Sequence, residues 1–239
     1  MRSKNKFLSQ LGLILFFVGA LVGILFFAGL VWPSLEANFY FGYSGGADTK
    51  LRLSCPRIVT PQDKALVRAA VSNKVDRPIS PRFQTQISGP IMQVIQSQYT
   101  IEPGQTIYPT WEVGSNDLAF GHLIIAQVNQ YASYKTPTAA AACGSLFLFV
   151  PRLTGGQIYD LALVISMGLV VIGLFSWRAG RGDMTGLEHD QFMGMLLLGG
   201  IVLAGIVLGT LAQWILGTLA LAIAVLLFII QIERWLSLA

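Results

Sequence analysis

Hydrophobic residues gather in long uncharged runs along the chain, and the first of these runs covers residues 11–32. At a rise of 1.5 Å per residue, it is long enough to cross a hydrocarbon core of about 30 Å as a helix. The alternative is a cleaved signal peptide, but its apolar region usually has only about 7–15 residues before a small-residue cleavage site. The pattern therefore predicts a first transmembrane helix.

Three further spans are predicted toward the C-terminus. Residues 161–177 form an apolar run between Tyr159 and Trp177, and aromatic side chains favour the headgroup level of a bilayer. The run from 192 to 232 has about twice the length of one span and is interrupted at Gln213. We therefore expect two more helices joined by a tight turn, 192–212 and 215–232.

Between the first two predicted spans, apolar residues recur at every second position. Residues 82–87 alternate cleanly, and Ile107, Trp111 and Val113 share one face, as in half-buried strands. Other short runs are separated by turn sequences, at 51–55, 65–71, 91–101, 118–131 and 138–150. About seven strands at this spacing predict an antiparallel β-sandwich over residues 50–155.

Basic residues beside the predicted spans indicate their orientation. They lie before the first span, between the second and third, and after the fourth: Arg2, Lys4, Lys6, Arg178, Arg181 and Arg234. In a four-span protein these positions share one side, which the positive-inside rule identifies as the cytoplasm. We expect a multi-pass plasma-membrane protein with a cytoplasmic N-terminus (1–10), loop (178–191) and C-terminus (233–239), and with residues 33–160 outside.

Composition supports a membrane location, because 54% of the residues are hydrophobic and only 12% are charged. In soluble domains about a quarter of the residues carry charge. The formal net charge of +4 is small and spread along the chain, which argues against a nucleic-acid surface. The lipid bilayer is therefore an expected partner, and nucleic acid is not.

Three turn sequences stand at strand ends in the predicted β segment. They are Thr60-Pro61-Gln62-Asp63, Val71-Ser72-Asn73 and Ile101-Glu102-Pro103-Gly104-Gln105. Their order resembles bacterial immunoglobulin-like domains of the CARDB type, which usually serve as adhesive or spacing modules. The resemblance covers about 100 of the 239 residues and implies a fold rather than an activity. The expected fold class is a membrane protein with four transmembrane helices and an extracytoplasmic all-β immunoglobulin-like sandwich inserted between helices 1 and 2.

The chain has two cysteines, Cys55 in the first predicted strand and Cys143 in the last. First and last strands commonly neighbour each other in sandwiches of this kind, and the compartment outside the membrane is oxidising. We expect a disulfide between them. Two buried free thiols are the alternative, and two cysteines supply only half the ligands of a structural zinc site.

Residues 33–49 are expected to form an aromatic linker. In a seven-stranded sandwich, the first strand begins and the last strand ends at opposite ends of the domain. This segment would therefore run along the side of the sandwich from the membrane to the start of the first strand. Its aromatic residues would pack on the domain or on the headgroup layer: Phe39, Tyr40, Phe41 and Tyr43.

Small residues recur at four-residue spacing in the predicted helices, which allows close approach of helix backbones in lipid. These positions are Gly19 and Gly23 in the first span, and Gly200, Ala204, Gly205 and Gly209 in the third. They predict helix packing, either within a four-helix bundle or against a partner chain.

Residue types that carry chemistry do not form a recognisable constellation. His122 is expected to be hydrogen-bonded in a central strand, and His189-Asp190 to be solvated beside Glu188 and Asp183 in the loop. The sequence has no G-x-S-x-G or phosphate-binding motif, and the predicted spans carry no interior charge of the kind that ion-coupled transporters use. We therefore expect no catalytic residue, cofactor or metal.

The expected function is a non-enzymatic membrane protein that displays the sandwich outside the cell membrane. It would be an accessory or structural subunit of a larger assembly, with a protein partner in the membrane or at its outer face. The alternative is a ligand-binding sensor or transporter component.

Overall fold

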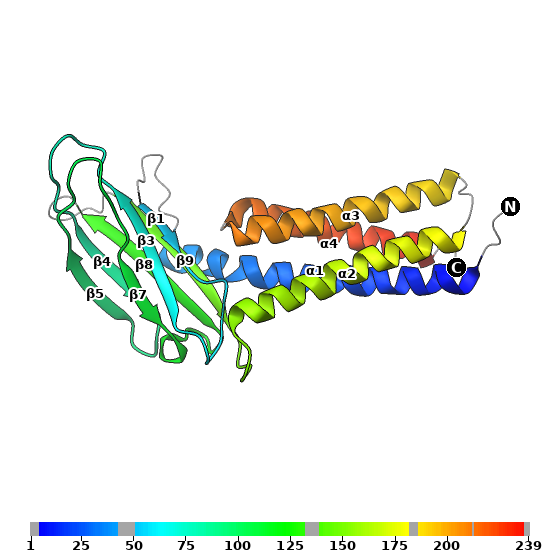
Figure 1. Ribbon diagram of the computed structural model, residues 1–239, viewed down its shortest axis with the longest axis horizontal. Coiled ribbons are helices and arrows are strands. Elements are labelled where there is room, and N and C mark those ends of the chain that lie inside the picture. Colours follow the sequence, from blue (N-terminus) through cyan, green and yellow to red (C-terminus); the bar gives the residue numbers. More distant parts are fainter. Residues whose placement is uncertain (1–4, 43–50, 132–138, 182–185, 212, 237–239) are drawn as a thin grey trace. The chain divides into compact units, whose positions relative to one another are not determined.

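The computed structural model describes residues 5–42, 51–131, 139–181, 186–211 and 213–236 (Figure 1). Within them one long helix comes first, nine strands follow, and three further helices complete the order. The chain forms two compact units. We call residues 1–31 together with 159–239 the helical unit, and residues 32–158 the β unit.

Among the described residues, four helices are long and apolar enough to cross a membrane: α1 (Lys6–Phe41), α2 (Gly155–Arg181), α3 (Gly186–Thr210) and α4 (Trp214–Leu236). Each overlaps one predicted span. The predicted loop 178–191 is mostly helical, since α2 continues to Arg181 and α3 begins at Gly186. Polar residues at the ends of the apolar runs continue the helical hydrogen bonding, which hydropathy does not detect.

The prediction of a linker from residue 33 onward is wrong for its first nine residues. α1 continues through Pro33 to Phe41, and Gly42 follows it with a left-handed φ of +77°. Asn38 Nδ2 donates to Ser34 O at 2.7 Å within this last part of the helix. The Pro33 carbonyl lies so close to Gly144 that a Cβ there would collide with it. The end of α1 is therefore part of the β unit.

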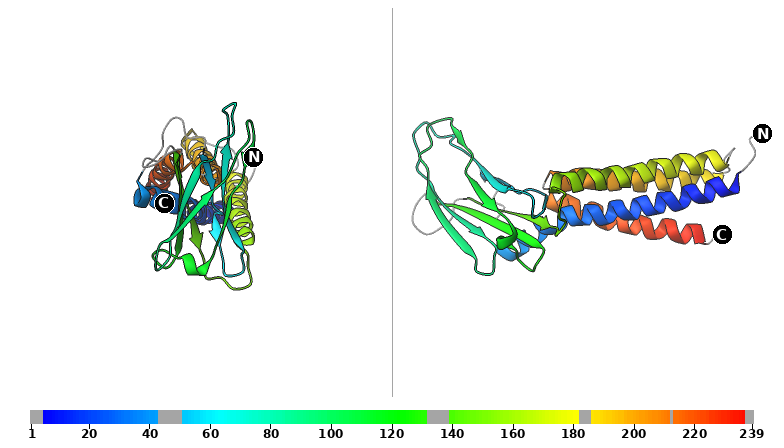
Figure 2. Two further views of the ribbon diagram at one scale, coloured as in Figure 1. Left: turned by 90° about the vertical axis from the view of Figure 1, so that its left-hand side faces the viewer. Right: turned by 60° about the horizontal axis from the view of Figure 1, so that its bottom comes forward.

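Two sheets make up the β unit (Figure 2). The first contains β1 (Leu51–Ser54), β3 (Ala65–Ser72), β6 (Thr106–Ile107) and β7 (Thr110–Val113). The second has the order β2 (Ile58–Val59), β9 (Ala139–Phe147), β8 (Leu123–Tyr131), β4 (Arg82–Ile87) and β5 (Gln93–Gln98). The pairing is antiparallel except between β2 and β9, which are parallel.

The two sheets share one hydrophobic core. Val67 and Trp111 from the first sheet and Phe83, Ile124 and Phe147 from the second belong to the same buried cluster. Along β3, every second residue from Ala65 to Val71 is buried, as the period-two pattern predicted. In the part of the chain that the structure describes, nine strands replace the expected seven, because β2 is an additional two-residue strand and the run 107–113 divides into β6 and β7.

The predicted disulfide between Cys55 and Cys143 is present, with a Cα–Cα distance of 5.8 Å. Cys55 directly follows β1, and the chain then crosses to the second sheet, where β2 pairs with β9. Both cysteines are buried, at 5% and 2% exposure. The bond therefore joins the end of β1 in the first sheet to a strand of the second sheet.

The β unit has two ends, which we name by their loops. The α2 pole consists of residues 60–64, 88–92, 114–122 and 148–154, the last of which lead into α2. The far pole includes residues 73–81 and 99–105. The predicted strand 118–131 begins only at Leu123, because Phe120 and Gly121 adopt left-handed φ angles of +53° and +77°, which belong to a turn.

Candidate functional site

Two of the predicted packing residues bring α1 into close contact with α2. A Cβ on Gly19 would lie 2.7 Å from Leu169 Cβ and 2.8 Å from Val170 N. Ser166 Oγ donates a hydrogen bond to Gly19 O at 3.1 Å, and the same hydroxyl faces Gly23. The space beside these two glycines is therefore occupied by α2 of the same chain.

Gly205 and Gly209 of α3 face α1. A Cβ on Gly205 would collide with the ring of Phe27, which has 0% exposure. A Cβ on Gly209 would lie 3.0 Å from Leu30 Cβ. This face of α3 therefore packs inside the helical unit.

Gly200 and Ala204 have a different environment from the other small residues of α3. Both are exposed, and a Cβ on Gly200 would meet no atom within 4 Å among the residues that the structure describes. Among the described residues, nothing therefore covers the Gly200–Ala204 face, which points out of the helical unit.

A glycine seam between α1 and α2 was missed by sequence reasoning. A Cβ on Gly12 would collide with Trp177 N and lie 2.8 Å from Gly173 O. Gly180 is similarly placed against the backbone of Ser9. Ser166, Gly173 and Gly180 are spaced by seven residues, the repeat of helices that wrap around each other, and this spacing could have revealed the seam.

Arg181 at the end of α2 holds three helices together. Its Nε donates to Ser9 Oγ of α1 at 3.0 Å, and its Nη1 contacts Glu188 Oε1 of α3 at 2.9 Å. The guanidinium also lies 5.3 Å from the centre of the Trp177 ring, which stacks on Phe192. Glu188 therefore forms a structural ion pair, whereas the predicted loop would have left it solvated.

The predicted interface aromatics lie at the end of α1. Phe39 and Tyr40 are exposed, at 76% and 53%, and the Tyr40 and Phe41 rings meet edge to face at 5.1 Å. Tyr43 lies outside the described residues. These rings are thus carried on a helix and not on an extended linker.

Asp63 at the α2 pole fixes the first turn of α2. Its Oδ2 accepts hydrogen bonds from Thr60 N at 2.8 Å, Thr60 Oγ1 at 3.0 Å and Gly155 N at 2.8 Å. Thr154 and Gln157 complete the helix start with reciprocal side-chain to backbone hydrogen bonds of 3.3 and 3.0 Å. The Thr60–Asp63 turn singled out in the sequence is therefore a helix cap.

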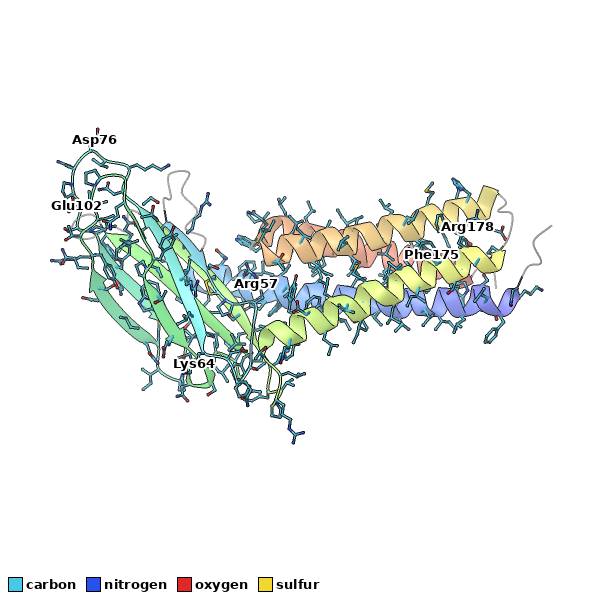
Figure 3. The ribbon with its side chains drawn as sticks, in the orientation of Figure 1. Arg57, Lys64, Asp76, Glu102, Phe175 and Arg178 are labelled. Atoms are coloured by element: carbon cyan, nitrogen blue, oxygen red, sulfur yellow. A yellow bond between two sulfur atoms is a disulfide. The ribbon has the colours of Figure 1, made fainter. Side chains whose placement is uncertain are left out.

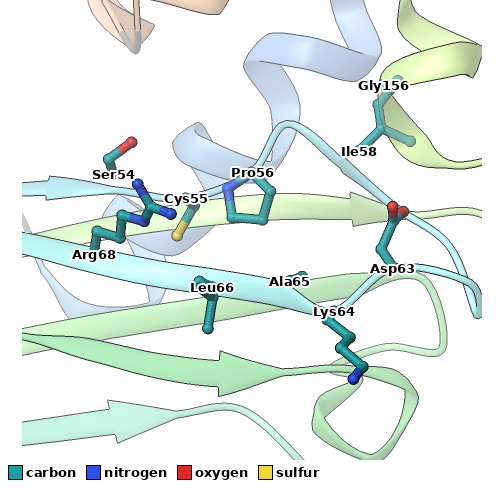
Figure 4. A pocket seen from close by; sticks show the side chains of 10 residues that line it. All are labelled: Ser54, Cys55, Pro56, Ile58, Asp63, Lys64, Ala65, Leu66, Arg68 and Gly156. Atoms are coloured by element: carbon teal, nitrogen blue, oxygen red, sulfur yellow. The ribbon is translucent and has the colours of Figure 1, made fainter.

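A groove of about 400 Å³ lies beside the disulfide and the start of α2 (Figure 4). Its two cationic side chains, Lys64 and Arg68, are both exposed and come from β3 and the turn before it. Figure 4 shows that they point away from each other. The groove is open to solvent, and its two cationic side chains do not converge on one position.

The two histidines do not form a reactive site with other described residues. His122 lies in the turn before β8 and not in a central strand, and its Nδ1 is 2.7 Å from Phe120 O. His189 and Asp190 are exposed on α3, and Asp183 lies outside the described residues. In the described part of the chain, no three His, Cys, Asp or Glu side chains gather around a position that could hold a metal.

Comparisons with known proteins give a weak likeness of fold. No family model and no curated protein matches the chain. The CARDB domain of a Pyrococcus furiosus protein, solved in complex with di-metal ions, has a TM-score of 0.35 and 11% identity, and the match covers 43% of this chain and 94% of that one. A Bacteroides uniformis β-glucuronidase (TM-score 0.31, 14% identity) and a Listeria innocua β-glucosidase with glucose (0.29, 12%) match over 41% and 44% of this chain. The matches span only 13% and 17% of those two enzymes.

Proposed function

We propose that this chain is a non-enzymatic, multi-pass plasma-membrane protein that displays the β unit on the extracytoplasmic side, as an accessory or structural subunit of a larger membrane assembly. The observation that carries the proposal is the tight interior of the helical unit, where Gly12, Gly19 and Gly173 meet backbone atoms of the neighbouring helix. A cavity near Trp177 and Gln231 has only about 20 Å³, room for about one water molecule. Such packing suits an anchor better than a substrate path.

The orientation follows from charge and redox chemistry. Lys6, Arg178, Arg181 and Arg234 lie at the ends of helices that would share the cytoplasmic side. The β unit would then be outside, where an oxidising compartment allows its disulfide to persist. We also propose that the β unit is related to domains of the CARDB type, on the basis of its three turn sequences.

The proposed protein partner would pack a helix against the outward Gly200–Ala204 face of α3. Small residues let helix backbones approach closely in lipid, where apolar side chains alone give little specificity. Gly205, on the inward face of the same helix, provides a matched control.

The test compares Gly200→Leu with Gly205→Leu in the full chain, extracted from native membranes in a mild detergent. We expect Gly200→Leu to leave the melting temperature of the purified chain unchanged but to reduce the mass of the extracted complex. Gly205→Leu should lower the melting temperature, because the new side chain would displace the buried Phe27 ring. A wild-type chain extracted as a monomer, or a complex that is unaffected by Gly200→Leu, would contradict the proposed partner site.

The alternative is a ligand-binding sensor, for which the groove beside the disulfide is the relevant feature. A sensor would be favoured if a small anionic molecule bound the purified chain and binding were lost in Arg68→Ala but retained in Arg52→Ala. The diverging directions of Lys64 and Arg68 in Figure 4 are the reason that we place this function second.

A further inference from the structure

Three of the four loops at the α2 pole carry an exposed apolar side chain. Ile91 is 84% exposed, Phe120 63% and Phe149 65%. They are brought to one end by the second sheet, in which Ile87 pairs with Gln93 and Leu123 pairs with Leu146. Exposed apolar groups that gather in this way indicate an interaction surface.

The local structure holds the two phenylalanines outward. Phe120 has a left-handed φ of +53°, which is uncommon for a bulky residue. The carbonyl oxygen of Phe120 also accepts a hydrogen bond from His122 Nδ1 at 2.7 Å. The Phe149 ring packs edge to face on the buried Phe147 ring at 4.8 Å. Local contacts therefore fix the position of each of these two exposed side chains.

The exposed charged side chains of the four loops at this pole are basic, whereas the adjoining strand β7 adds the exposed Glu112, which lines a hollow together with Lys64. Both acidic residues of its loops are engaged in the fold: Asp63 caps α2, and Asp117 is 8% exposed and accepts hydrogen bonds from Gln93 Nε2 and Gly114 N. Among the described residues of these four loops, the exposed charged or titratable side chains are Lys64, His122 and Arg152. The loops of this pole therefore combine exposed apolar side chains with exposed basic ones.

The far pole differs in charge. Lys74, Asp76, Arg77 and Glu102 are all exposed there, and Figure 3 labels Asp76 and Glu102 at the opposite end of the sheets from Lys64. Basic and acidic groups are thus mixed at the far pole and give no preference for an anionic surface.

We propose that the α2 pole lies in the headgroup layer of the bilayer that α2 enters, with Phe120, Phe149 and Ile91 inserted among the lipids and Lys64 and Arg152 facing lipid phosphates. This inference rests on the proposed membrane function. α2 begins at Gly155, six residues before its apolar run, which is about 9 Å along a helix. The headgroup layer of one leaflet is about 5–8 Å thick, so Gly155 lies at its outer edge and the apolar tips of the flanking loops have to reach only a short way to enter it.

The test places a nitroxide label on a single introduced cysteine in the full chain, reconstituted in vesicles of phosphatidylcholine and phosphatidylglycerol. The two native cysteines are bonded and buried, so only the introduced thiol reacts. Labels at Phe120 and Phe149 are compared with one at Tyr108, which is similarly exposed (67%) between β6 and β7. A label at Leu219 of α4 reports whether the helices are in the membrane at all.

Relaxation by oxygen, which concentrates in lipid, is then compared with relaxation by a water-soluble nickel complex. We expect labels at Phe120, Phe149 and Leu219 to favour oxygen and the label at Tyr108 to favour nickel. The inference is overturned if Phe120 and Phe149 behave like Tyr108 while Leu219 is in lipid. It is also overturned if they are closed to both reagents, since a protein would then cover the pole. A label at Leu219 that favours nickel would instead refute the proposed membrane anchor.

The charged part of the inference has its own test. Arg152→Glu should move the Phe120 label toward water in vesicles that contain phosphatidylglycerol, and should have less effect in phosphatidylcholine alone. An equal effect in both lipids, or none in either, would overturn the role of the basic residues.

Discussion

Replacing Gly173 of α2 by alanine is expected to destabilise the helical unit, because the added methyl group meets the backbone of α1. A Cβ at this position would lie 2.7 Å from both Gly12 O and Phe16 Cα, and would also collide with Phe16 N. Ordinary Cβ contacts begin at 3.4 Å. The two helices would therefore have to separate locally by at least about 0.7 Å, enough to lose a quarter to a half of the attraction in each affected contact.

The expected magnitude follows from two opposing effects. Overpacking of this kind costs about 1–3 kcal/mol, whereas alanine is a better helix former than glycine by about 1 kcal/mol. Gly168→Ala is the matched control, since it lies in the same helix and a Cβ there meets no described atom within 4 Å. Because both variants receive the same gain in helix propensity, their free energies of unfolding should differ by about 1–3 kcal/mol.

The assay is unfolding of the full chain by increasing SDS in mixed micelles, followed by far-ultraviolet circular dichroism. The midpoint of Gly173→Ala should lie below that of the wild type, and that of Gly168→Ala should not. Coincident curves for the two variants would refute the conclusion that α1 and α2 touch at backbone distance.

Three further predictions concern the contacts that fasten each unit. Asp63→Ala should lower the stability of the β unit by about 1–3 kcal/mol, because the Gly155 amide and the turn before β3 lose their acceptor; hydrogen exchange at these amides measures the loss. Removing the Cys55–Cys143 bond by a double alanine substitution should lower the free energy of unfolding in urea by about 2–4 kcal/mol. A loss of stability smaller than that of Asp63→Ala would show that other contacts hold the 88-residue loop. Arg181→Ala should lower the free energy of unfolding by about 1–2 kcal/mol. Arg181→Lys keeps the charge and should lower it by less. Equal losses of stability in the two variants would assign the role to the shape of the guanidinium and not to its charge.

The helices and the sheets could be predicted from the sequence because their signals are local. A 22-residue apolar run or an alternating strand such as β4 is recognised without knowledge of its neighbours. The ends were less predictable, since α1 continues through Pro33, a residue that usually interrupts a helix. The predicted strand 118–131 began five residues too early, because the positive φ of Phe120 ends the extended conformation there and a non-glycine residue with positive φ leaves no clear sequence signal.

The candidate contacts were harder to predict because their partners are distant in sequence. The turn at Asp63 was found, but its acceptor role depends on Gly155, 92 residues later. Gly19 and Gly205 were recognised as small, yet whether such a residue faces its own chain or a partner depends on helix rotation. The structure resolves this for each position, and it separates Gly205 from Gly200 on the same helix.

The distribution of the glycines explains why the helical unit can be tight in one place and open in another. Lipid tails are as apolar as leucine, so burial of apolar surface does not by itself draw helices together in a bilayer. Close backbone contact through small residues is the alternative, and α1 meets α2 in this way at Gly12, Gly19 and Gly173. α1 and α2 are also the helices whose ends, residues 32–41 and 155–158, belong to the β unit. This backbone-distance contact therefore joins the two helices whose ends belong to the β unit, which is where the proposed anchor would have to resist separation.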